Sequence, residues 1–454
     1  MRGTARIYAS VVTAVVIGLL TAACSSGPPQ TPAQASASAA AASAAAAASA
    51  SASASAHAAL MASELKITPA NGSRGVSPSA GITVTATKGK VTNVTVSAPG
   101  GAAMPGGLVD GGRAWHSTWT LGVSQRYTVT ATGTDGSGQK ITTTSSFRTL
   151  APASTFSTEI YEGSGQTYGV GMPIMLIFSH PITNRAAVER SLELTTSKPV
   201  IGSWYWDNSE HLDFRPRDYW PANTTVSFEG HLDGVQGAAG VYGAANLTQT
   251  FTIGRSLIAV ASTTTHKTQI YLNGKLTYDW PISTGRASLP TPDGTYLSVQ
   301  KNNPVRMIGG GPPGSAGYYN ELVNWAVRFT FSGDYYHSAP WSVVDQGTTN
   351  VSHGCVNLPP EDATIYYNMS IPGDPITVTA STAAGKWDDG WTEWFLPFSQ
   401  FVKGSALGMA VQAGPQGSQF VTPSSLPADA ASSPLSTSAA GNYDAGSANI
   451  ANAG

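Results

Sequence analysis

Short runs of alternating hydrophobic and polar residues recur along most of the chain after residue 63. Alternation with a period of two puts the apolar side chains on one face of a strand, and clusters of Gly, Pro, Asn and Asp between the runs are typical of turns. In the region 63–150 the runs are Ile82–Ala86, Val91–Val96, Tyr127–Thr132 and Ile141–Phe147. This pattern predicts a small immunoglobulin-like β-sandwich, with Trp115 and Trp119 filling its core.

The region 151–254 repeats the same pattern and predicts a second sandwich of similar size. Its expected strands are Ile174–Phe178, Gly202–Trp206, Leu212–Phe214, Thr225–Glu229 and Thr248–Ile253. Four histidines in these two regions have no partner in the sequence, and we interpret them as ordinary loop or strand residues: His116, His180, His211 and His231.

The region 255–380 begins with an expected hairpin of Leu257–Ser262 and Gln269–Leu272, and Pro292-Asp293-Gly294 is a turn signal between later strands. Asn303–Asn324 is rich in Gly and Pro and shows no periodicity, so we expect an irregular loop, which beside a site often serves as a lid. Pro359–Asn368 predicts a short helix.

The two ends differ in composition from the centre. Residues 25–62 and 412–454 are dominated by small and polar residues, and both are expected to be disordered, the first as a tether. Residues 381–411 carry six aromatic side chains, which we expect to dock onto the neighbouring domains rather than bind glycan. They are Trp387, Trp391, Trp394, Phe395, Phe398 and Phe401.

Composition and the N-terminus indicate a mainly β, exported protein. Of 454 residues only 11% are charged and 49 are Gly, and a formal net charge of −2 without basic runs disfavours a nucleic-acid partner. Arg2 and Arg6 precede the apolar run Val11–Leu20 and then small residues before Cys24. This order predicts a lipoprotein signal peptide over 1–24 with Cys24 lipidated, the alternative being ordinary secretory cleavage.

The chain has one other cysteine, Cys355, and two of its eight histidines, His337 and His353, lie shortly before it. A lone cysteine is usually a small buried hydrophobe, but a thiol near an imidazole is also the minimum required for nucleophilic acyl transfer. If Cys24 carries lipid, Cys355 has no disulfide partner in the chain, which favours a reactive role. Gly354 allows close backbone approach and can leave N–H groups free for an oxyanion.

His337, fourteen intervening residues, and then Ser352-His353-Gly354-Cys355-Val356-Asn357 resemble the signature of the L,D-transpeptidase catalytic domain (YkuD type). His337–Val343 resembles the actinobacterial cell-wall members, and Ser283–Tyr296 matches the family's Ser-Thr-Gly … Thr-Pro-x-Gly-x-Tyr run. The resemblance implies two immunoglobulin-like domains followed by a β-rich catalytic domain over 255–380 and a short aromatic C-terminal extension.

The same resemblance implies roles for individual residues. Cys355 is the expected nucleophile and His337 its base, while His353 and Ser338 shape the site or orient His337. Backbone N–H groups of Gly354 and Cys355 are candidates for the oxyanion hole. The expected substrate-binding residues are Met307, Tyr319, Trp325, Ser352 and Asn357; core packing is an equal alternative for Met307 and Trp325, and a turn-stabilising role is favoured for Asn357.

The implied reaction joins peptidoglycan stem peptides. The thiolate attacks the third residue of a donor tetrapeptide, D-Ala leaves, and the side-chain amine of a second stem gives a 3→3 cross-link, with carbapenems as expected inhibitors and no cofactor or metal. One alternative is a cysteine hydrolase of wall peptides that uses water as acceptor, although papain-like enzymes place Cys before His. A zinc site of His337, His353 and Cys355 is disfavoured for want of a fourth ligand. A non-catalytic wall-binding lipoprotein is the last alternative.

Overall fold

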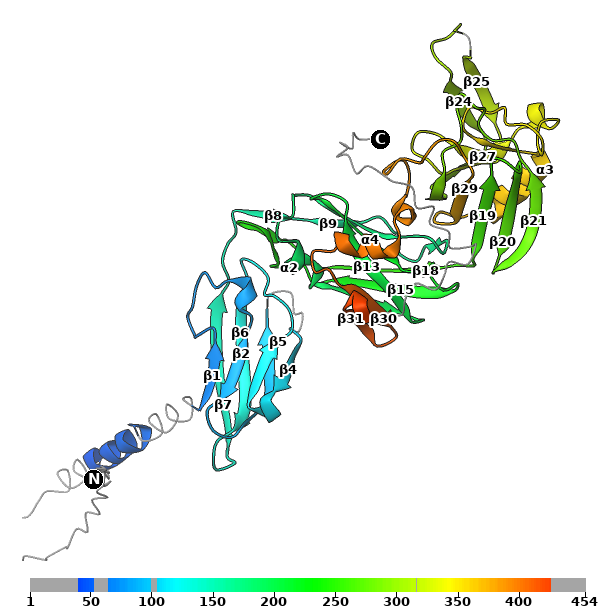
Figure 1. Cartoon of the computed structure of the whole chain (residues 1–454). Coiled ribbons are helices and arrows are strands. Elements are labelled where there is room, and N and C mark those ends of the chain that lie inside the picture. The colour runs from blue at the N-terminus through cyan, green and yellow to red at the C-terminus, as the bar shows by residue number, and fades with distance from the viewer. Residues whose placement is uncertain (1–39, 53–63, 99–103, 316, 426–454) are drawn as a thin grey trace, which may run out of the picture. The chain divides into compact units, whose positions relative to one another are not determined.

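The computed structural model describes residues 40–52, 64–98, 104–315 and 317–425 (Figure 1). The chain divides into two units, 1–63 and 64–454. In the first unit residues 40–52 form a helix with exposed side chains, so the expectation of disorder over 25–62 is wrong for this stretch. Alanine, which dominates it, has the highest helix propensity of all residues. The expected signal peptide, Cys24 included, lies outside the described residues.

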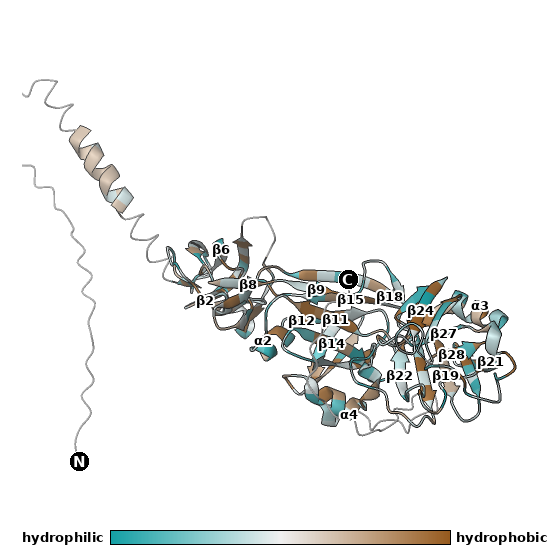
Figure 2. Cartoon of the chain, turned by 90° about the horizontal axis from the view of Figure 1, so that it is seen from above, coloured by the Kyte–Doolittle hydropathy of each residue, from teal (hydrophilic) through white to brown (hydrophobic). Residues whose placement is uncertain are grey.

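The described helices include none that is long and apolar enough to cross a membrane. Hydrophobic and hydrophilic residues alternate along the strands of the second unit, as Figure 2 shows. The mainly β fold class is therefore confirmed.

The first domain is a sandwich of a four-stranded sheet, order β1-β2-β5-β4, and a three-stranded sheet, order β3-β6-β7. Its elements are β1 (Leu65–Thr68), η1 (Pro78–Ala80), β2 (Thr83–Ala86), β3 (Lys90–Ser97), β4 (Gly106–Val109), η2 (Asp110–Gly112), β5 (Ala114–Ser117), β6 (Arg126–Thr134) and β7 (Lys140–Arg148). Trp115 is buried in it, as expected. The placement of Trp119 in this core is wrong: it follows the end of β5, is half-buried, and stacks on His231 of the next domain with ring centroids 3.8 Å apart.

The second domain contains two four-stranded halves whose side chains share one hydrophobic core. Its elements are β8 (Ser154–Phe156), β9 (Thr158–Ile160), β10 (Thr167–Tyr168), β11 (Ile174–Phe178), α2 (Arg185–Glu189), β12 (Leu192–Thr196), β13 (Val200–Trp206), β14 (His211–Pro216), β15 (Thr224–Gly230), β16 (Gln236–Ala238), β17 (Val241–Gly243) and β18 (Leu247–Ile253). A strand from the far end of the chain joins the halves, giving the order β10-β18-β15-β12-β30-β13-β14-β11-β9.

That joining strand corrects the expected C-terminal boundary. The disordered tail was expected from residue 412, but β30 (Ala410–Gly414) and β31 (Gly417–Val421) form a hairpin, followed by η6 (Pro423–Ser425). Small residues and Gly suggested disorder there, yet Ala410, Val411 and Ala413 are buried between β12 and β13.

The aromatic segment docks onto its neighbours, as expected. It contains η4 (Glu393–Phe395), α4 (Phe398–Phe401) and η5 (Val402–Gly404). The buried Arg215 guanidinium on β14 donates to the carbonyls of Glu393 and Leu396 at 3.0 and 2.7 Å. It also lies over the rings of Trp394 and Phe401, 4.4 and 4.5 Å from their centroids.

The catalytic region contains a five-stranded sheet, β21-β20-β19-β29-β22, and a four-stranded sheet, β23-β26-β27-β28. Its elements are β19 (Leu257–Ser262), β20 (Lys267–Leu272), β21 (Lys275–Pro281), β22 (Gly294–Leu297), β23 (Gln300–Asn302), β24 (Val305–Gly309), β25 (Tyr319–Val323), β26 (Ala326–Arg328), β27 (Tyr335–Ser338), η3 (Pro340–Ser342), β28 (Val356–Leu358), α3 (Pro360–Met369) and β29 (Pro375–Thr379). The expected helix is α3. The prediction of an irregular loop over 303–324 is wrong at both ends of that range, because β24 and β25 pair there as a hairpin.

Candidate active site

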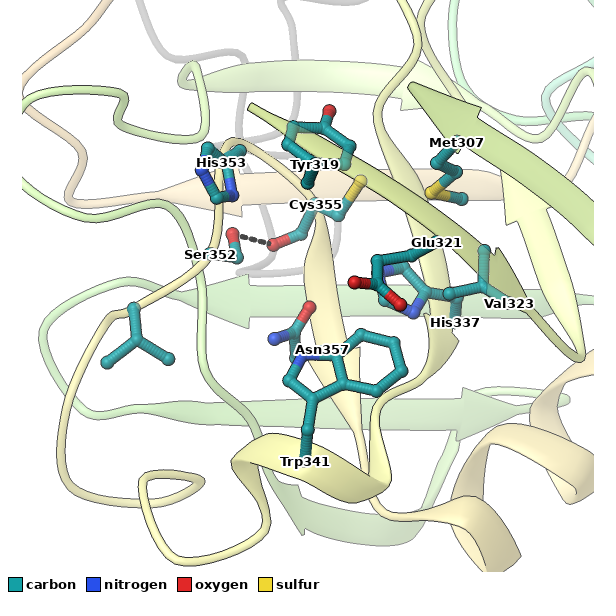
Figure 3. A pocket seen from close by; sticks show the side chains of 11 residues that line it. Met307, Tyr319, Glu321, Val323, His337, Trp341, Ser352, His353, Cys355 and Asn357 are labelled. Carbon is teal, nitrogen blue, oxygen red and sulfur yellow. Dashed lines mark hydrogen bonds between the residues drawn. The ribbon is translucent and has the colours of Figure 1, made fainter. Parts of the chain in front are cut away.

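The cysteine and histidines of the sequence motif lie at one pocket of about 340 Å³ in the catalytic region (Figure 3). The β24–β25 hairpin, β27, η3 and the turn before β28 surround it. Its lining residues are Met307, Tyr319, Glu321, Val323, His337, Trp341, Val351, Ser352, His353, Cys355 and Asn357.

The turn that carries the thiol requires glycine. Gly354 has φ +136°, a backbone conformation that residues with a side chain rarely adopt. A Cβ at this position would lie 2.3 Å from the Asp334 carboxylate. Ser352 Oγ donates to the Cys355 carbonyl at 2.6 Å and accepts from the Gly354 N–H at 3.1 Å. The Gly354 N–H is therefore engaged, which corrects its expected oxyanion role and leaves the Cys355 N–H as the candidate donor.

The segment 283–291, which follows β21, holds this turn in place through hydrogen bonds. Ser283 and Asn357 exchange two backbone hydrogen bonds, and Ser352 N–H donates to the Thr284 carbonyl at 3.0 Å. Thr291 Oγ1 donates to the Gly354 carbonyl at 2.5 Å and accepts from the Gly285 N–H at 2.9 Å. One buried hydroxyl thus ties the 283–291 segment to the nucleophile turn.

His337 is buried at the end of β27, and its ring orientation is set by the backbone. Nδ1 lies 2.9 Å from the Ser338 carbonyl, so Nδ1 carries the proton and Nε2 is left as an acceptor. Burial lowers the pKa of His337 to about 4. Ser338 therefore orients His337 through its carbonyl, and its side chain is not among those lining the pocket.

Cys355 is half-buried and, like His337, uncharged at neutral pH. Desolvation, followed by the nearby Asp334 carboxylate, raises the pKa of the thiol to about 12. The thiol donates to the Gly333 carbonyl at 3.8 Å, and among the described residues it makes no hydrogen bond to His337. The resting pair is a neutral thiol and a neutral imidazole, and catalytic hydrogen bonds of this kind often form only with substrate bound.

The structure places four of the five expected substrate-binding residues at the pocket and one outside it. Met307, Tyr319, Ser352 and Asn357 line the pocket. Trp325 instead packs against Tyr367 with centroids 5.3 Å apart, so its placement at the substrate site is wrong and the core alternative holds.

Two of the lining side chains have a clear structural role as well. His353 lies against Tyr319, 4.6 Å between centroids, and burial followed by the charge of Arg286 lowers the His353 pKa. Asn357 Nδ2 donates to Ser342 Oγ at 3.0 Å and so fixes η3 beside β28.

Sequence reasoning missed Glu321, Val323, Trp341 and Val351. The first two were hidden because residues 303–324 were treated as an irregular loop. The signal that could have found them is the spacing of Tyr319, Glu321 and Val323, which puts all three on one face of a strand.

In the part of the chain that the structure describes, three candidate metal ligands come together in the second domain and not at the pocket. Among the described residues, one set brings three ligating atoms within 4.8 Å of one another, namely Glu193, Glu229 and His231 in the second domain. His337, His353 and Cys355 do not form such a set, so their arrangement does not fit the zinc alternative.

The fold and the pocket define a class: a β-rich enzyme in which immunoglobulin-like structure precedes an acyl-transferring domain. Residues 73–236 match the bacterial Ig domain family, and residues 256–378 match the L,D-transpeptidase catalytic domain, YkuD. The chain belongs to the L,D-transpeptidase family and is an acyltransferase.

Relatives support this assignment over most of the chain. L,D-transpeptidase 2 of Mycobacterium tuberculosis is 34% identical over 354 residues, 77% of this chain and 86% of the relative. L,D-transpeptidase 5 of the same species is 32% identical over 355 residues, 76% and 78% of the two chains. These two relatives carry the assignment.

The chain is also similar to a solved L,D-transpeptidase in complex with imipenem, which is 38% identical; the match covers 49% of this chain and 97% of the solved one, with a TM-score of 0.43.

Proposed function

We propose that this L,D-transpeptidase forms 3→3 peptidoglycan cross-links through a thioester on Cys355. The observation that carries the proposal is the shared pocket of one thiol, one buried imidazole with a free Nε2, and a glycine turn beside the sulfur. These are the groups needed for nucleophilic acyl transfer.

In the first half-reaction, His337 Nε2 takes the thiol proton as Cys355 Sγ attacks the carbonyl of the third residue of the donor tetrapeptide. The Cys355 N–H stabilises the oxyanion, an effect of about 3 kcal/mol per donor in other enzymes. The C–N bond to D-Ala then breaks, and the imidazolium returns its proton to the leaving amine. The second half-reaction is attack of an acceptor amine on the thioester.

The surrounding side chains position the two stems. Met307 and Tyr319 on the hairpin, and His353 against the Tyr319 ring, form the walls along which the donor extends. Ser352 and Asn357 hold the turn and η3 rather than touching reacting atoms. A carbapenem, whose strained carbonyl is open to a thiolate, would acylate the same sulfur and act as an inhibitor.

The site of action follows from the N-terminal pattern. We propose that the chain is exported, lipidated on Cys24 and held at the outer face of the cytoplasmic membrane, with residues 25–62 reaching into the wall. Radiolabelled palmitate should enter the wild type and not Cys24→Ser; equal labelling of both would refute lipidation.

Intact-mass spectrometry of the folded domains tests the enzyme proposal. Incubation with a tetrapeptide stem should release D-Ala, give a transient thioester and yield a stem dimer, and a carbapenem should add one adduct. Cys355→Ala should show none of these. Trimming of the peptide without a dimer would establish a hydrolase instead, and a wild type without any adduct would refute Cys355 as nucleophile.

A further inference from the structure

Glu321 is the one carboxylate among the described residues that line the pocket. It lies on β25, directly across from Met307 on β24, and Figure 3 shows its side chain directed into the pocket.

The hairpin that carries Glu321 turns this side chain toward the pocket. Tyr319, Glu321 and Val323 face the pocket, whereas Leu322 and Ile308 face outward and are 54% and 60% exposed. Because side chains alternate strictly along a strand, a slip of one residue would turn Leu322 toward the pocket and Glu321, which is itself exposed, away from it. The register of the hairpin therefore places a solvent-exposed carboxylate, rather than the apolar Leu322, at the pocket.

Glu321 also lacks a structural partner. Within the described part of the chain it forms no ion pair, and Arg306, the cation of the same hairpin, donates to Asn320 Oδ1 at 2.7 Å instead. The lowered pKa values of His337 and His353 leave both rings uncharged at neutral pH, and the Cys355 thiol is uncharged too. Glu321 is therefore the one carboxylate in the described lining of the pocket, whereas Asp334 and Arg286 act on Cys355 and His353 from outside the lining.

We propose that Glu321 binds the side-chain ammonium of the acceptor stem and makes the thioester selective for a cationic amine. This inference rests on the proposed function, because it needs a Cys355 thioester that awaits an acceptor. A carboxylate attracts an ammonium group and offers nothing comparable to an uncharged nucleophile. Glu321 is thus an acceptor-binding residue rather than a base.

The step balances without any further reactant. The bound ammonium releases one proton to solvent, and the free amine attacks the thioester carbonyl. The new C–N bond forms, the C–S bond breaks, and a second proton passes through His337 from the attacking nitrogen to the departing thiolate. Thioester and ammonium become amide, thiol and one proton.

A competition between two nucleophiles tests the role of Glu321. The Cys355 thioester is formed from the tetrapeptide stem and offered either a stem with a charged primary amine or hydroxylamine, which is uncharged at neutral pH. For Glu321→Gln we expect the ratio of the two aminolysis rate constants to fall at least tenfold in favour of hydroxylamine. Glu321→Asp should retain most of the preference, and added salt should weaken it in the wild type.

Glu361→Gln is the matched control, because Glu361 is an exposed carboxylate on α3 that does not line the pocket. It should leave the ratio unchanged. An unchanged ratio in Glu321→Gln, with the thioester formed normally, overturns the acceptor site alone. An equal loss with both nucleophiles also overturns it, since it would place Glu321 in stabilising the His337 imidazolium. A wild type that forms no thioester overturns the proposed function and this inference together.

Discussion

At the scale of single residues, the reacting pair is defined by burial more than by mutual contact. Desolvation lowers the pKa of the His337 imidazolium to about 4 and raises that of the Cys355 thiol to about 12. Each group therefore rests in its neutral form, and charge develops only when the proton moves during attack. This differs from a preformed thiolate–imidazolium pair, and the difference can be measured.

The acid limb of the acylation rate should lie near pH 4. His337 is a competent base only when unprotonated, and its lowered pKa keeps it so at every pH above about 4. The rate constant for carbapenem acylation should therefore stay nearly flat as the pH falls from 7 to 5.5, where an ordinary histidine would already be protonated. Stopped-flow absorbance checks this, with circular dichroism as a control for folding. A midpoint between 6 and 7 would contradict a neutral resting pair.

Gly354→Ala should abolish acylation and lower stability. The substitution places a Cβ 2.3 Å from Asp334 at a φ of +136°, and backbone strain of this kind costs about 1–3 kcal/mol. Relief of the clash would move the turn that carries Cys355. Thermal unfolding and carbapenem acylation measure the two effects.

Gly333→Ala is the control that separates the effect of backbone strain from the effect of the clash with Asp334. Gly333 also has a positive φ, +115°, but nothing lies within 4 Å of the added Cβ. It should lower the melting temperature but leave far more acylation than Gly354→Ala. Equal activity losses in the two variants would mean that the Asp334 contact is unimportant.

At the scale of elements, the nucleophile turn depends on a segment more than sixty residues earlier in the chain. Thr291 reaches both Gly354 and Gly285 with one buried hydroxyl, and backbone bonds from Ser283 and Thr284 complete the support. The turn signal at 292–294 therefore marks a segment whose function is to hold the site in place.

Thr291→Val should keep the shape of the side chain and lose the hydroxyl. Leaving the Gly354 carbonyl and Gly285 N–H unpaired costs about 1–3 kcal/mol, and the loosened turn should slow acylation by about 10- to 100-fold. Thr291→Ser, which keeps the donor, should behave nearly as the wild type. If the valine variant acylates at the wild-type rate, Thr291 does not position the nucleophile.

The sequence predicted the strands that show a clear alternation of apolar and polar residues and missed those that do not. Strand β11 and the hairpin of β19 with β20 were expected because alternation is a local property. Strands β24 and β25 were missed because Ile308 and Leu322 point outward, so the apolar positions do not mark an inner face. The motif was enough to predict Cys355 and His337 as site residues. The position of Glu321 at the pocket and the hydrogen bond from the Gly354 N–H to Ser352 depend on contacts in space, which the spacing of residues in the sequence does not reveal.

At the scale of the whole molecule, the C-terminal residues complete the second domain. Strand β30 lies between β12 and β13, so a segment from near the C-terminus fills the centre of a sheet whose strands, apart from the β30–β31 hairpin, end at residue 253. On the way there the chain passes Arg215, which donates to two of its carbonyls and stacks on its rings. The catalytic region is thus inserted in sequence between strands of one sheet, so we expect the stability of the two to be coupled.

Truncation tests this coupling directly. A chain ending at residue 409 loses β30 and leaves the facing edges of β12 and β13 unpaired in the centre of the sheet, which favours aggregation. We expect it to melt at least 10 °C lower, or to be insoluble, and to lose carbapenem acylation although every pocket residue is present. A chain ending at residue 425 keeps β30 and β31 with all their described contacts and should match the full-length protein in both measurements. Equal melting temperatures for the two truncated chains would show that the sheet does not need β30. Loss of stability without loss of acylation would show that the catalytic region folds independently of the domain it is inserted into.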